Sequence, residues 1–575
     1  MSKITETLYS ENFSGKVLSG LRSLIINDQL CDLSLVVDGQ CMRVHKVVMA
    51  ATSDYFRVIL TIDMKEKGED NINLKGVPWR GLQEVVTFAY TGQLRCTFDN
   101  ITDVLVAATH LQFVDAIQLC SKYLTGLTST GNCVDMYNIS EQFNLVQLKD
   151  KSMSLILADF DEISKREQFF EFGFEFLAKI LGNDSLRIAN ELQLFELVIQ
   201  WINHDRDERA EHAADLLDKV RLPLIKPTDL VQTVMNEPLM KKDPACLELV
   251  LEANKYHMLP DKQPLLQNER TRVRNTKPSI IILDLDDDGP HVFDLESKMW
   301  GTLKFANVET FHAQVCVIDN YMYICGGIEL YSTNNPVSAR CYRYDPRFDA
   351  WAEISPMEEP RHHFTLVGDG RSMFAIGGYC GGTFKNVVEQ YDIRDGHWTK
   401  KTPLDLRLSA AASAVHDGKV YVVGGQTDKG ITRSLWSYHV DSDSWSSKAP
   451  MKLARMDHAV CSYANRLFVI GGYNKDIIKA YDVSTVECYE IECDQWSVIC
   501  EAAPKMSGIN CCLIDYKVYM IGGFSYDENK KRSEIRCYDI KTNEWHTISR
   551  IHNPAMAVPC CALYMPSHVL RSIAI

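Results

Sequence analysis

The sequence of 575 residues lacks the features of an exported, membrane-spanning or nucleic-acid-binding protein. Its first residues, 1–13, mix charged side chains with no apolar core, so we expect no secretory signal. No run of 18 apolar residues occurs, which predicts no membrane-spanning helix and no membrane partner. Acidic residues exceed basic ones and give a net charge of −15. A phosphate backbone is therefore not expected as a partner.

Cysteine is frequent, at 19 residues, but no C-x-x-C pair occurs. Without an export signal the thiols should stay reduced in the cytoplasm, mostly as small buried side chains. His362 and His363 are adjacent, yet the sequence offers them no partner ligand, and we predict no metal site. The P-loop, the G-x-S-x-G motif and the dinucleotide fingerprint are also missing. We therefore expect neither an enzyme nor a cofactor.

Three regions of different character follow one another. Residues 1–127 are predicted to be mixed α/β, with an apolar strand that ends at the hairpin turn Asp38-Gly39 and helices after it. Residues 128–258 show helical periodicity and almost no strand signal. Residues 259–277 are polar and are interpreted as a linker.

An internal repeat fills the last region. Glycine pairs begin at residues 326, 377, 424, 471 and 522, with spacings of 51, 47, 47 and 51, and each pair closes an apolar strand. Six aromatic residues each precede a tryptophan by seven positions: Phe293, Tyr344, Tyr391, Tyr438, Tyr489 and Tyr538. A period of about 50 residues with a glycine pair at a strand end indicates a six-bladed kelch-type propeller.

The first propeller unit is incomplete, because its strand at 278–285 has no strand before it. We predict that residues 555–564 supply the missing strand and close the ring, so that residues 278–566 form one propeller without a free sheet edge.

Several motifs together resemble the kelch-like family, with a BTB domain at 1–127, a BACK domain at 128–258 and the propeller after the linker. The first resemblance lies in Val44-His-Lys-Val-Val-Met-Ala-Ala51 and Phe88-Ala-Tyr-Thr-Gly92, and the second in Phe195-Glu-Leu-Val-Ile-Gln-Trp201 and Val220-Arg-Leu-Pro-Leu224. Kelch-like proteins commonly act as substrate adaptors of cullin-3 ubiquitin ligases. The resemblance therefore implies a non-catalytic adaptor with cullin-3 and a protein substrate as partners.

The resemblance also implies sites in the first two domains. Met64 and Glu66 match the hydrophobic-x-Glu motif of family members that bind cullin, and Asn132 and Met136 lie in the segment that widens this contact. Ile62 and Asp63 stand where many relatives have small residues. The segment 9–24 resembles the element that packs on a partner subunit, which predicts a homodimer. Its apolar residues at helical spacing are Phe13, Val17, Leu18 and Leu21.

In relatives that bind peptides on the propeller, the residue after each glycine pair and a matching residue on the loop into each innermost strand face the central mouth. The first set here is Ile328, Tyr379, Gln426, Tyr473 and Phe524, and the second, counted as two residues past Arg361, Arg407, Arg455 or Ser507, is His363, Ser409, Asp457 and Ile509. Aromatic side chains and one acid favour a hydrophobic or basic peptide over an acidic one. The alternative is that these aromatic residues only fill the channel wall.

A second function stays open. Some kelch proteins bind actin through the propeller and need no cullin, so a cytoskeletal scaffold is the main alternative, and Glu66 in its motif favours the adaptor. A BTB transcription factor is less favoured, because no zinc-finger spacing of cysteine and histidine occurs.

Overall fold

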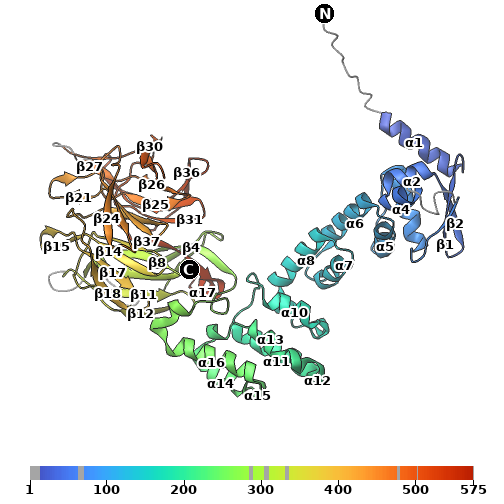
Figure 1. The fold of residues 1–575 in the computed structure, drawn as a ribbon, viewed down its shortest axis with the longest axis horizontal. Coiled ribbons are helices and arrows are strands. Elements are labelled where there is room, and N and C mark those ends of the chain that lie inside the picture. Colours follow the sequence, from blue (N-terminus) through green and yellow to red (C-terminus); the bar gives the residue numbers. More distant parts are fainter. Residues whose placement is uncertain are drawn as a thin grey trace, which may run out of the picture. The chain divides into compact units, whose positions relative to one another are not determined.

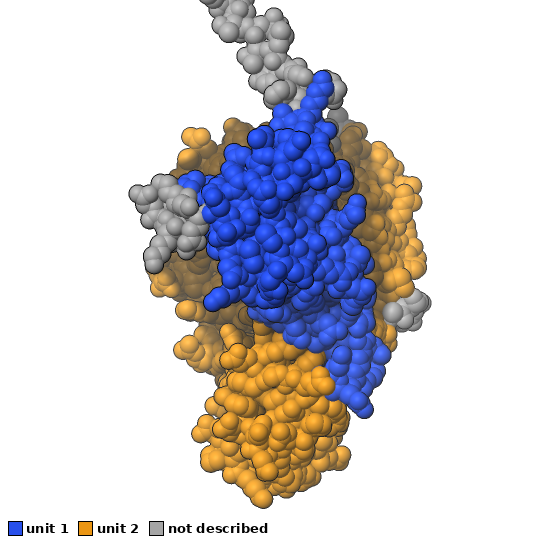
Figure 2. Space-filling model, turned by 90° about the vertical axis from the view of Figure 1, so that its right-hand side faces the viewer, with its two compact units in different colours: residues 1–168 blue, residues 169–575 orange. Residues whose placement is uncertain are grey.

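The structure is a computed structural model that describes residues 13–61, 70–283, 289–303, 310–329, 336–475, 479–501 and 503–573. The chain divides into two compact units, residues 1–168 and 169–575 (Figure 2). The division falls inside the helical region 128–258, so its first helices belong to the first unit.

The first unit combines a small sheet with helices (Figure 1). In the sheet order β2-β1-β3, β1 pairs antiparallel with β2 and parallel with β3. Positive φ angles at Asp38 (48°) and Gly39 (81°) make the predicted hairpin turn between β1 and β2. The elements are α1 (Phe13–Ile26), β1 (Leu33–Val37), β2 (Gln40–Val44), α2 (Lys46–Thr52), α3 (Asp54–Thr61), β3 (Asn71–Asn73), α4 (Trp79–Thr91), α5 (Ile101–His110), α6 (Val114–Leu127), α7 (Cys133–Gln142), α8 (Val146–Ala158) and α9 (Phe160–Ile163).

One core joins this sheet to its helices. Leu33, Leu35 and Val37 alternate along β1 and are buried, as period-2 patterning requires, and they belong to one cluster with the inner faces of α4, α5 and α6. Helix α4 ends at Gly92, whose φ of 66° is the left-handed conformation that the glycine at this position predicts.

The second unit begins with helices that lead into the propeller (Figure 1). These helices are α10 (Phe174–Leu181), α11 (Glu191–His204), α12 (Arg206–Arg209), α13 (Ala213–Asp218), α14 (Pro227–Gln232), α15 (Pro238–Lys242) and α16 (Pro244–Met258), with 3-10 turns between them and one at Pro260–Leu266. Trp201 of α11 is buried and donates its indole N–H to the carbonyl of Phe172 at 3.1 Å. The predicted helical stripe of α11 is thus part of the core.

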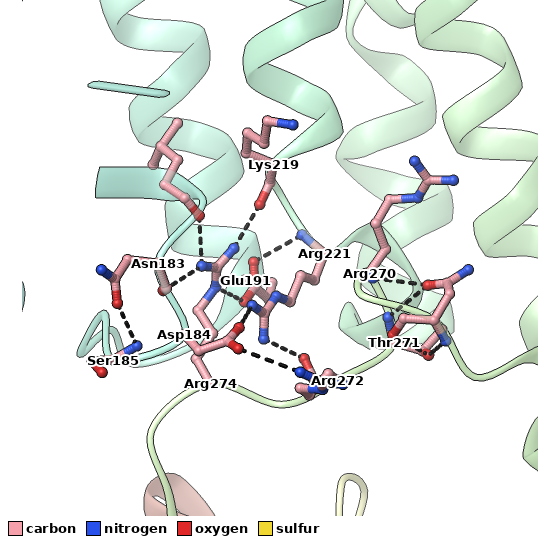
Figure 3. Close-up of polar contacts among 12 residues, drawn as sticks. Asn183, Asp184, Ser185, Glu191, Lys219, Arg221, Arg270, Thr271, Arg272 and Arg274 are labelled. Carbon is pink, nitrogen blue, oxygen red and sulfur yellow. Dashed lines mark hydrogen bonds and ion pairs between the residues drawn. The ribbon is translucent and has the colours of Figure 1, made fainter. Parts of the chain in front are cut away.

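The segment predicted as a linker, 259–277, is ordered and tied to these helices (Figure 3). The Arg274 guanidinium is 3% exposed and pairs with Glu191 at 2.7 Å. It also donates to the backbone carbonyls of Leu181 (2.6 Å) and Lys219 (2.6 Å). Because a buried charge is stabilised by partners of this kind, Arg274 fixes the segment to the helices, and the segment does not act as a free spacer.

A second polar cluster connects the same segment to the propeller. The Arg347 guanidinium pairs with Asp345 at 2.7 Å and donates to the side chain of Gln267 at 2.8 Å. It lies over the ring of Tyr321, 4.1 Å from the ring centroid. It also lies 5.6 Å from the ring centroid of Tyr256 on α16, which is within the range of a second cation–π contact. The propeller and the end of the helical region therefore share a buried interface.

The propeller consists of six four-stranded antiparallel sheets in the described part of the chain, as the six aromatic–tryptophan pairs predict. From the innermost strand outward, the blades are β37-β4-β5-β6 (Cys560–Pro566, Thr276–Ile282, His291–Asp294, Trp300–Thr302), β8-β9-β11-β12 (Gln314–Ile318, Tyr321–Cys325, Cys341–Asp345, Ala350–Ile354), β13-β14-β17-β18 (Thr365–Gly368, Ser372–Ile376, Val388–Asp392, His397–Lys401), β19-β20-β23-β24 (Ala412–His416, Lys419–Val423, Leu435–His439, Ser444–Lys448), β25-β26-β29-β30 (Ala459–Tyr463, Arg466–Ile470, Val486–Glu490, Gln495–Cys500) and β31-β32-β35-β36 (Asn510–Ile514, Lys517–Ile521, Glu534–Asp539, Glu544–Arg550).

The strand after each glycine pair forms a short two-stranded sheet, in four cases with the next strand of the chain and in the first case with a strand that precedes the glycine pair. These sheets pair β7 with β10 (Thr310–Phe311, Ile328–Glu329), β15 with β16 (Tyr379–Cys380, Thr383–Phe384), β21 with β22 (Gln426–Thr427, Gly430–Ile431), β27 with β28 (Tyr473–Lys475, Ala480–Asp482) and β33 with β34 (Phe524–Ser525, Lys530–Lys531).

The ring is closed by the C-terminal strand, as predicted. β37 pairs antiparallel with β4, but it begins at Cys560 and not at residue 555. The reason is that the carbonyl of Ala555 accepts a hydrogen bond from the amide of Gly523 on the preceding blade, so this stretch serves as the loop into the strand. Helix α17 (Ser567–Ile573), which the sequence analysis did not predict, packs on β37 and β6.

The repeated tyrosines and tryptophans are cross-strand neighbours within each blade. Tyr438 lies opposite Trp445, with ring centroids 4.9 Å apart, and Tyr489 lies opposite Trp496 at 5.1 Å. The Trp445 indole N–H also donates to the carbonyl of Thr402 on the preceding blade at 2.9 Å. The tyrosine–tryptophan repeat therefore marks a contact within each blade and, at Trp445, a hydrogen bond to the preceding blade.

Candidate functional site

A cavity of about 1180 Å³ occupies the centre of the propeller. The innermost strands β37, β8, β13, β19, β25 and β31 surround it, and each contacts the next around the closed ring. Concave sites are the usual places where proteins bind ligands.

The glycine pairs hold neighbouring blades together beside this cavity. Gly471 has a φ of 66°, and a Cβ built on it would lie 2.6 Å from the carbonyl oxygen of Met506 on the next blade. The amide of Gly472 donates to this same oxygen at 2.8 Å. Any larger residue would separate the two blades, which explains why glycine recurs with the repeat.

A belt of six residues with left-handed backbone surrounds the mouth of the cavity. Each belt residue lies on the loop into an innermost strand, and four successive backbone hydrogen bonds of 2.7–3.1 Å join His363 through to Ala557. The belt residues, with φ angles between 51° and 57°, are His312, His363, Ala410, Asp457, Gly508 and Ala557. The belt positions one residue from each blade at the mouth.

The belt corrects two of the predicted equivalences. His363 and Asp457 are belt residues, whereas Ser409 precedes the belt residue Ala410 and Ile509 follows the belt residue Gly508. Ser409 is 6% exposed and pairs its backbone with Gln426, and Ile509 is 4% exposed and packs in a core cluster. Both still border the cavity. Counting back fourteen residues from the first glycine of each pair gives the belt residues, whereas counting two residues forward from Arg407 and Ser507 does not.

The residues after the glycine pairs are all half-buried, and each begins a strand of one of the short two-stranded sheets. Tyr379, Gln426 and Tyr473 line the cavity, but Ile328 and Phe524 do not. The structure thus brings seven of the nine predicted substrate-binding residues to one cavity.

Two aromatic clusters flank the mouth, and each contains a residue that the sequence analysis missed. The ring of Tyr526 stacks on Tyr473 with centroids 4.2 Å apart. On another side of the mouth, the ring centroids of His312 and His363 lie 3.8 Å apart, and the ring of His363 also contacts that of His362. Because residues 312 and 363 occupy equivalent places in adjacent blades, the glycine spacing could have identified the contact between them.

These histidines are uncharged at neutral pH. Burial lowers the pKa of His312 to about 3 and that of His363 to about 4, with the neighbouring imidazoles adding to the effect. Burial also lowers the pKa of His362. Among the residues that the structure describes, no group of three or more histidine, cysteine or acidic side chains has an arrangement that could hold a metal ion.

Asp457 is the acidic member of the belt. Burial raises the pKa of its carboxyl group to about 6, and no other group contributes to this shift. Neither a lysine nor an arginine occurs among the described residues that line the cavity, and Asp515 is the other acid there. The nearby arginines are used elsewhere: Arg455 pairs with Glu487 at 2.5 Å, and Arg361 pairs with Glu389, each inside a blade.

Comparison with known protein families agrees with this architecture. The BTB/POZ domain matches residues 21–127, and BACK (BTB And C-terminal Kelch) matches residues 133–235. The Kelch motif matches 310–358 and 360–404, and the KLHDC2/KLHL20/DRC7 Kelch-repeats domain matches 409–568. Kelch-like protein 26 of Mus musculus is 36% identical over 536 residues, which are 91% of this chain and 88% of that protein. This chain belongs to the BTB–BACK–Kelch family.

Other Kelch-like proteins are similar at comparable levels. Kelch-like protein 26 of Homo sapiens is 34% identical over 91% of this chain and 87% of its own length. Kelch-like protein 9 of Mus musculus is 32% identical over 66% of this chain and 63% of its own length. The similarity to Kelch-like protein 26 extends through all three domains of the family.

The BTB and BACK residues predicted to bind cullin differ in accessibility. Met64 and Glu66 lie outside the described residues. Asn132 is partly exposed just before α7, where its side-chain oxygen accepts from the amide of Ser129 at 2.8 Å. Met136 is 1% exposed and packs in the core of the first unit, so the prediction that it contacts a partner is wrong. The sequence does not indicate that Met136 is buried, because α7 has only a weak apolar face.

The predicted dimerisation residues lie on α1. Val17 and Leu18 are 45% and 40% exposed, whereas Leu21 packs against the core of its own BTB domain, together with Ile25. The Phe13 side chain is not among those described. The helix therefore has an exposed apolar part near its start and an anchored part near its end. All 19 cysteines of the chain are free thiols, and no described helix has the length and apolar character needed to cross a membrane.

Proposed function

We propose that this protein is a non-catalytic substrate adaptor of a cullin-3 ubiquitin ligase and acts in the cytoplasm. Its BTB and BACK domains bind cullin-3, and its propeller binds a protein substrate at the central cavity. The observation that carries the proposal is the open cavity in a chain whose family architecture places BTB and BACK domains before the propeller. The rings at its mouth, above all Tyr379 and Tyr473, are half-buried and so offer surface for a peptide.

In the BTB domain, Met64 supplies an apolar contact and Glu66 a carboxylate for donors on the cullin. Asn132 borders the same partner from the start of α7. The exposed Val17 and Leu18 pack on a second copy of the chain, which gives a homodimer with two propellers. A substrate with two binding segments then gains affinity, because its second segment binds at a raised effective concentration.

The test is co-purification of cullin-3 with the full-length chain. Replacing Met64 and Glu66 together by alanine should weaken the complex about thirtyfold or more, which corresponds to roughly 2 kcal/mol for interface hot spots. Val47→Ala, which shortens a valine that is 72% exposed in the same domain, is the matched control and should leave binding unchanged. Undiminished cullin-3 recovery with the double variant would contradict the proposed contact. Absence of cullin-3 with the natural chain, together with co-sedimentation with actin filaments, would favour the scaffold alternative.

A further inference from the structure

The Asp457 carboxylate is unpaired inside the central cavity. In the described part of the chain no hydrogen bond or ion pair stabilises it, and desolvation alone shifts its pKa. A charge that is removed from water without a partner destabilises the free protein. Such an arrangement is explained when a ligand supplies the partner.

The surroundings of Asp457 leave room for that partner. Its neighbours along the belt are Ala410, whose side chain is a single methyl group, and Gly508, which has no side chain. Three blades away in the six-membered ring, and therefore across the mouth, lies His312, which is uncharged at neutral pH. No described cation on the cavity wall competes for the carboxylate, so the mouth has one negative side and one neutral side.

Tyr473 adds a ring beside the carboxylate. It stacks on Tyr526, is half-buried and lines the cavity. Tyr473 lies close to the carboxylate, because its backbone pairs with that of Met456, the residue before Asp457. Burial, a hydrogen bond between Tyr473 and Tyr526, and the negative charge of Asp457 all raise the pKa of Tyr473. A carboxylate next to an aromatic face is a combination that suits a guanidinium group, which can stack on a ring and form two hydrogen bonds to a carboxylate.

We propose that the substrate segment carries a basic side chain, preferentially arginine, that enters the mouth between Ala410 and Gly508, pairs with Asp457 and stacks on Tyr473. This inference rests on the proposed function only in assigning the substrate to the propeller cavity. A segment without a cation would cover Asp457 and leave its charge buried and unpaired, and an acidic segment would add repulsion.

The experiment selects peptides from a displayed random library on the natural full-length chain. Selected sequences should be enriched in arginine or lysine. One selected peptide is then synthesised with its basic residue as arginine and, in a second version, as citrulline, which keeps the shape and removes the charge. Both are titrated against the natural chain and against Asp457→Asn and Asp515→Asn. Asparagine tolerates the left-handed backbone at both positions, and Asp515 is an exposed acid of the same cavity, so its variant is the matched control.

The natural chain and Asp515→Asn should bind the arginine peptide about thirtyfold or more tightly than the citrulline peptide, as expected when one partner of a desolvated charge pair is removed. Asp457→Asn should bind the two peptides almost equally. If Asp457→Asn keeps the preference for arginine, or if the library yields neutral or acidic sequences or no binder, the inference is wrong. Thermal melting of each variant shows whether it is folded.

Cullin-3 co-purification on the same samples separates this inference from the proposed function. Asp457→Asn should retain cullin-3. A natural chain that prefers arginine peptides but binds no cullin-3 would refute the ligase role and leave the inference standing. A chain that binds cullin-3 but shows no preference for arginine peptides would refute the inference and leave the ligase role standing.

Discussion

Asp457→Asn is expected to stabilise the propeller at neutral pH, even though it removes a group that we assign to binding. The folded-state pKa of about 6 lies above the value near 3.9 of an unperturbed aspartate. The folded chain therefore keeps this proton where the unfolded chain has lost it, and stability falls as pH rises from about 4 to about 6. At one pKa unit per 1.36 kcal/mol, the ionised carboxyl group costs the folded state about 3 kcal/mol at pH 7.5, as an upper bound because the side chain is partly exposed.

The asparagine variant lacks this proton equilibrium. Its advantage over the natural chain should therefore be largest at pH 7.5, at most about 3 kcal/mol, and should fall to at most about 1 kcal/mol at pH 4.5, where the unfolded aspartate is only partly ionised. Thermal melts of the full-length chain that follow tryptophan fluorescence measure this, because seven of the nine tryptophans lie in the propeller. The predicted signature is a melting temperature raised by a few degrees at pH 7.5 and by less at pH 4.5. Asp515→Asn is the control.

Two results would refute the reasoning. If Asp457→Asn melts at or below the temperature of the natural chain at pH 7.5, the carboxylate has a favourable partner in the folded protein. If the difference is the same at both pH values, the substitution acts through packing and not through the proton.

Two further predictions concern the glycine pairs and the dimer. In urea unfolding, Gly471→Ala should destabilise the propeller more than Gly418→Ala. Both glycines have φ near 65°, but only at Gly471 would the added Cβ meet a carbonyl oxygen, at 2.6 Å. Equal losses would mean that backbone strain of about 1 kcal/mol explains both. Light scattering should give twice the chain mass of 65.4 kDa for the natural protein and a monomer for the double variant Val17→Asp with Leu18→Asp, whereas Val146→Asp, at a valine 61% exposed in the first unit, should stay dimeric; a natural monomer at micromolar concentration contradicts the dimer.

The number of blades and their closure could be predicted from the sequence because they depend on local repetition. A tyrosine and a tryptophan seven residues apart, such as Tyr438 and Trp445, fall opposite each other in any hairpin of that length. The missing first strand could be inferred because the first unit lacks the innermost strand that every other unit has. The hairpin turn at Asp38-Gly39 and the helix end at Gly92 follow from backbone conformations that few other residues adopt.

Whether an individual side chain is buried or paired depends on contacts between segments that are distant in the sequence. Met136 is buried because its helix packs against the BTB core, which no periodicity within α7 indicates. The polar segment 259–277 is fixed because Arg274 finds Glu191, a residue far away in the sequence.

The mouth of the cavity shows the same division. The belt residues recur at a fixed distance before each glycine pair, but this distance is recognised only from the positive φ angles. These angles show that Ala410 and Gly508, and not Ser409 and Ile509, stand beside Asp457. The sequence by itself determined the domain order, the six blades and the ring of side chains around one cavity, because each depends on short-range pattern. Only the tertiary structure decided that Tyr526 packs on Tyr473 and that, among the described residues, Asp457 has no hydrogen-bond or ion-pair partner, because desolvation and pairing depend on everything that surrounds a group in space.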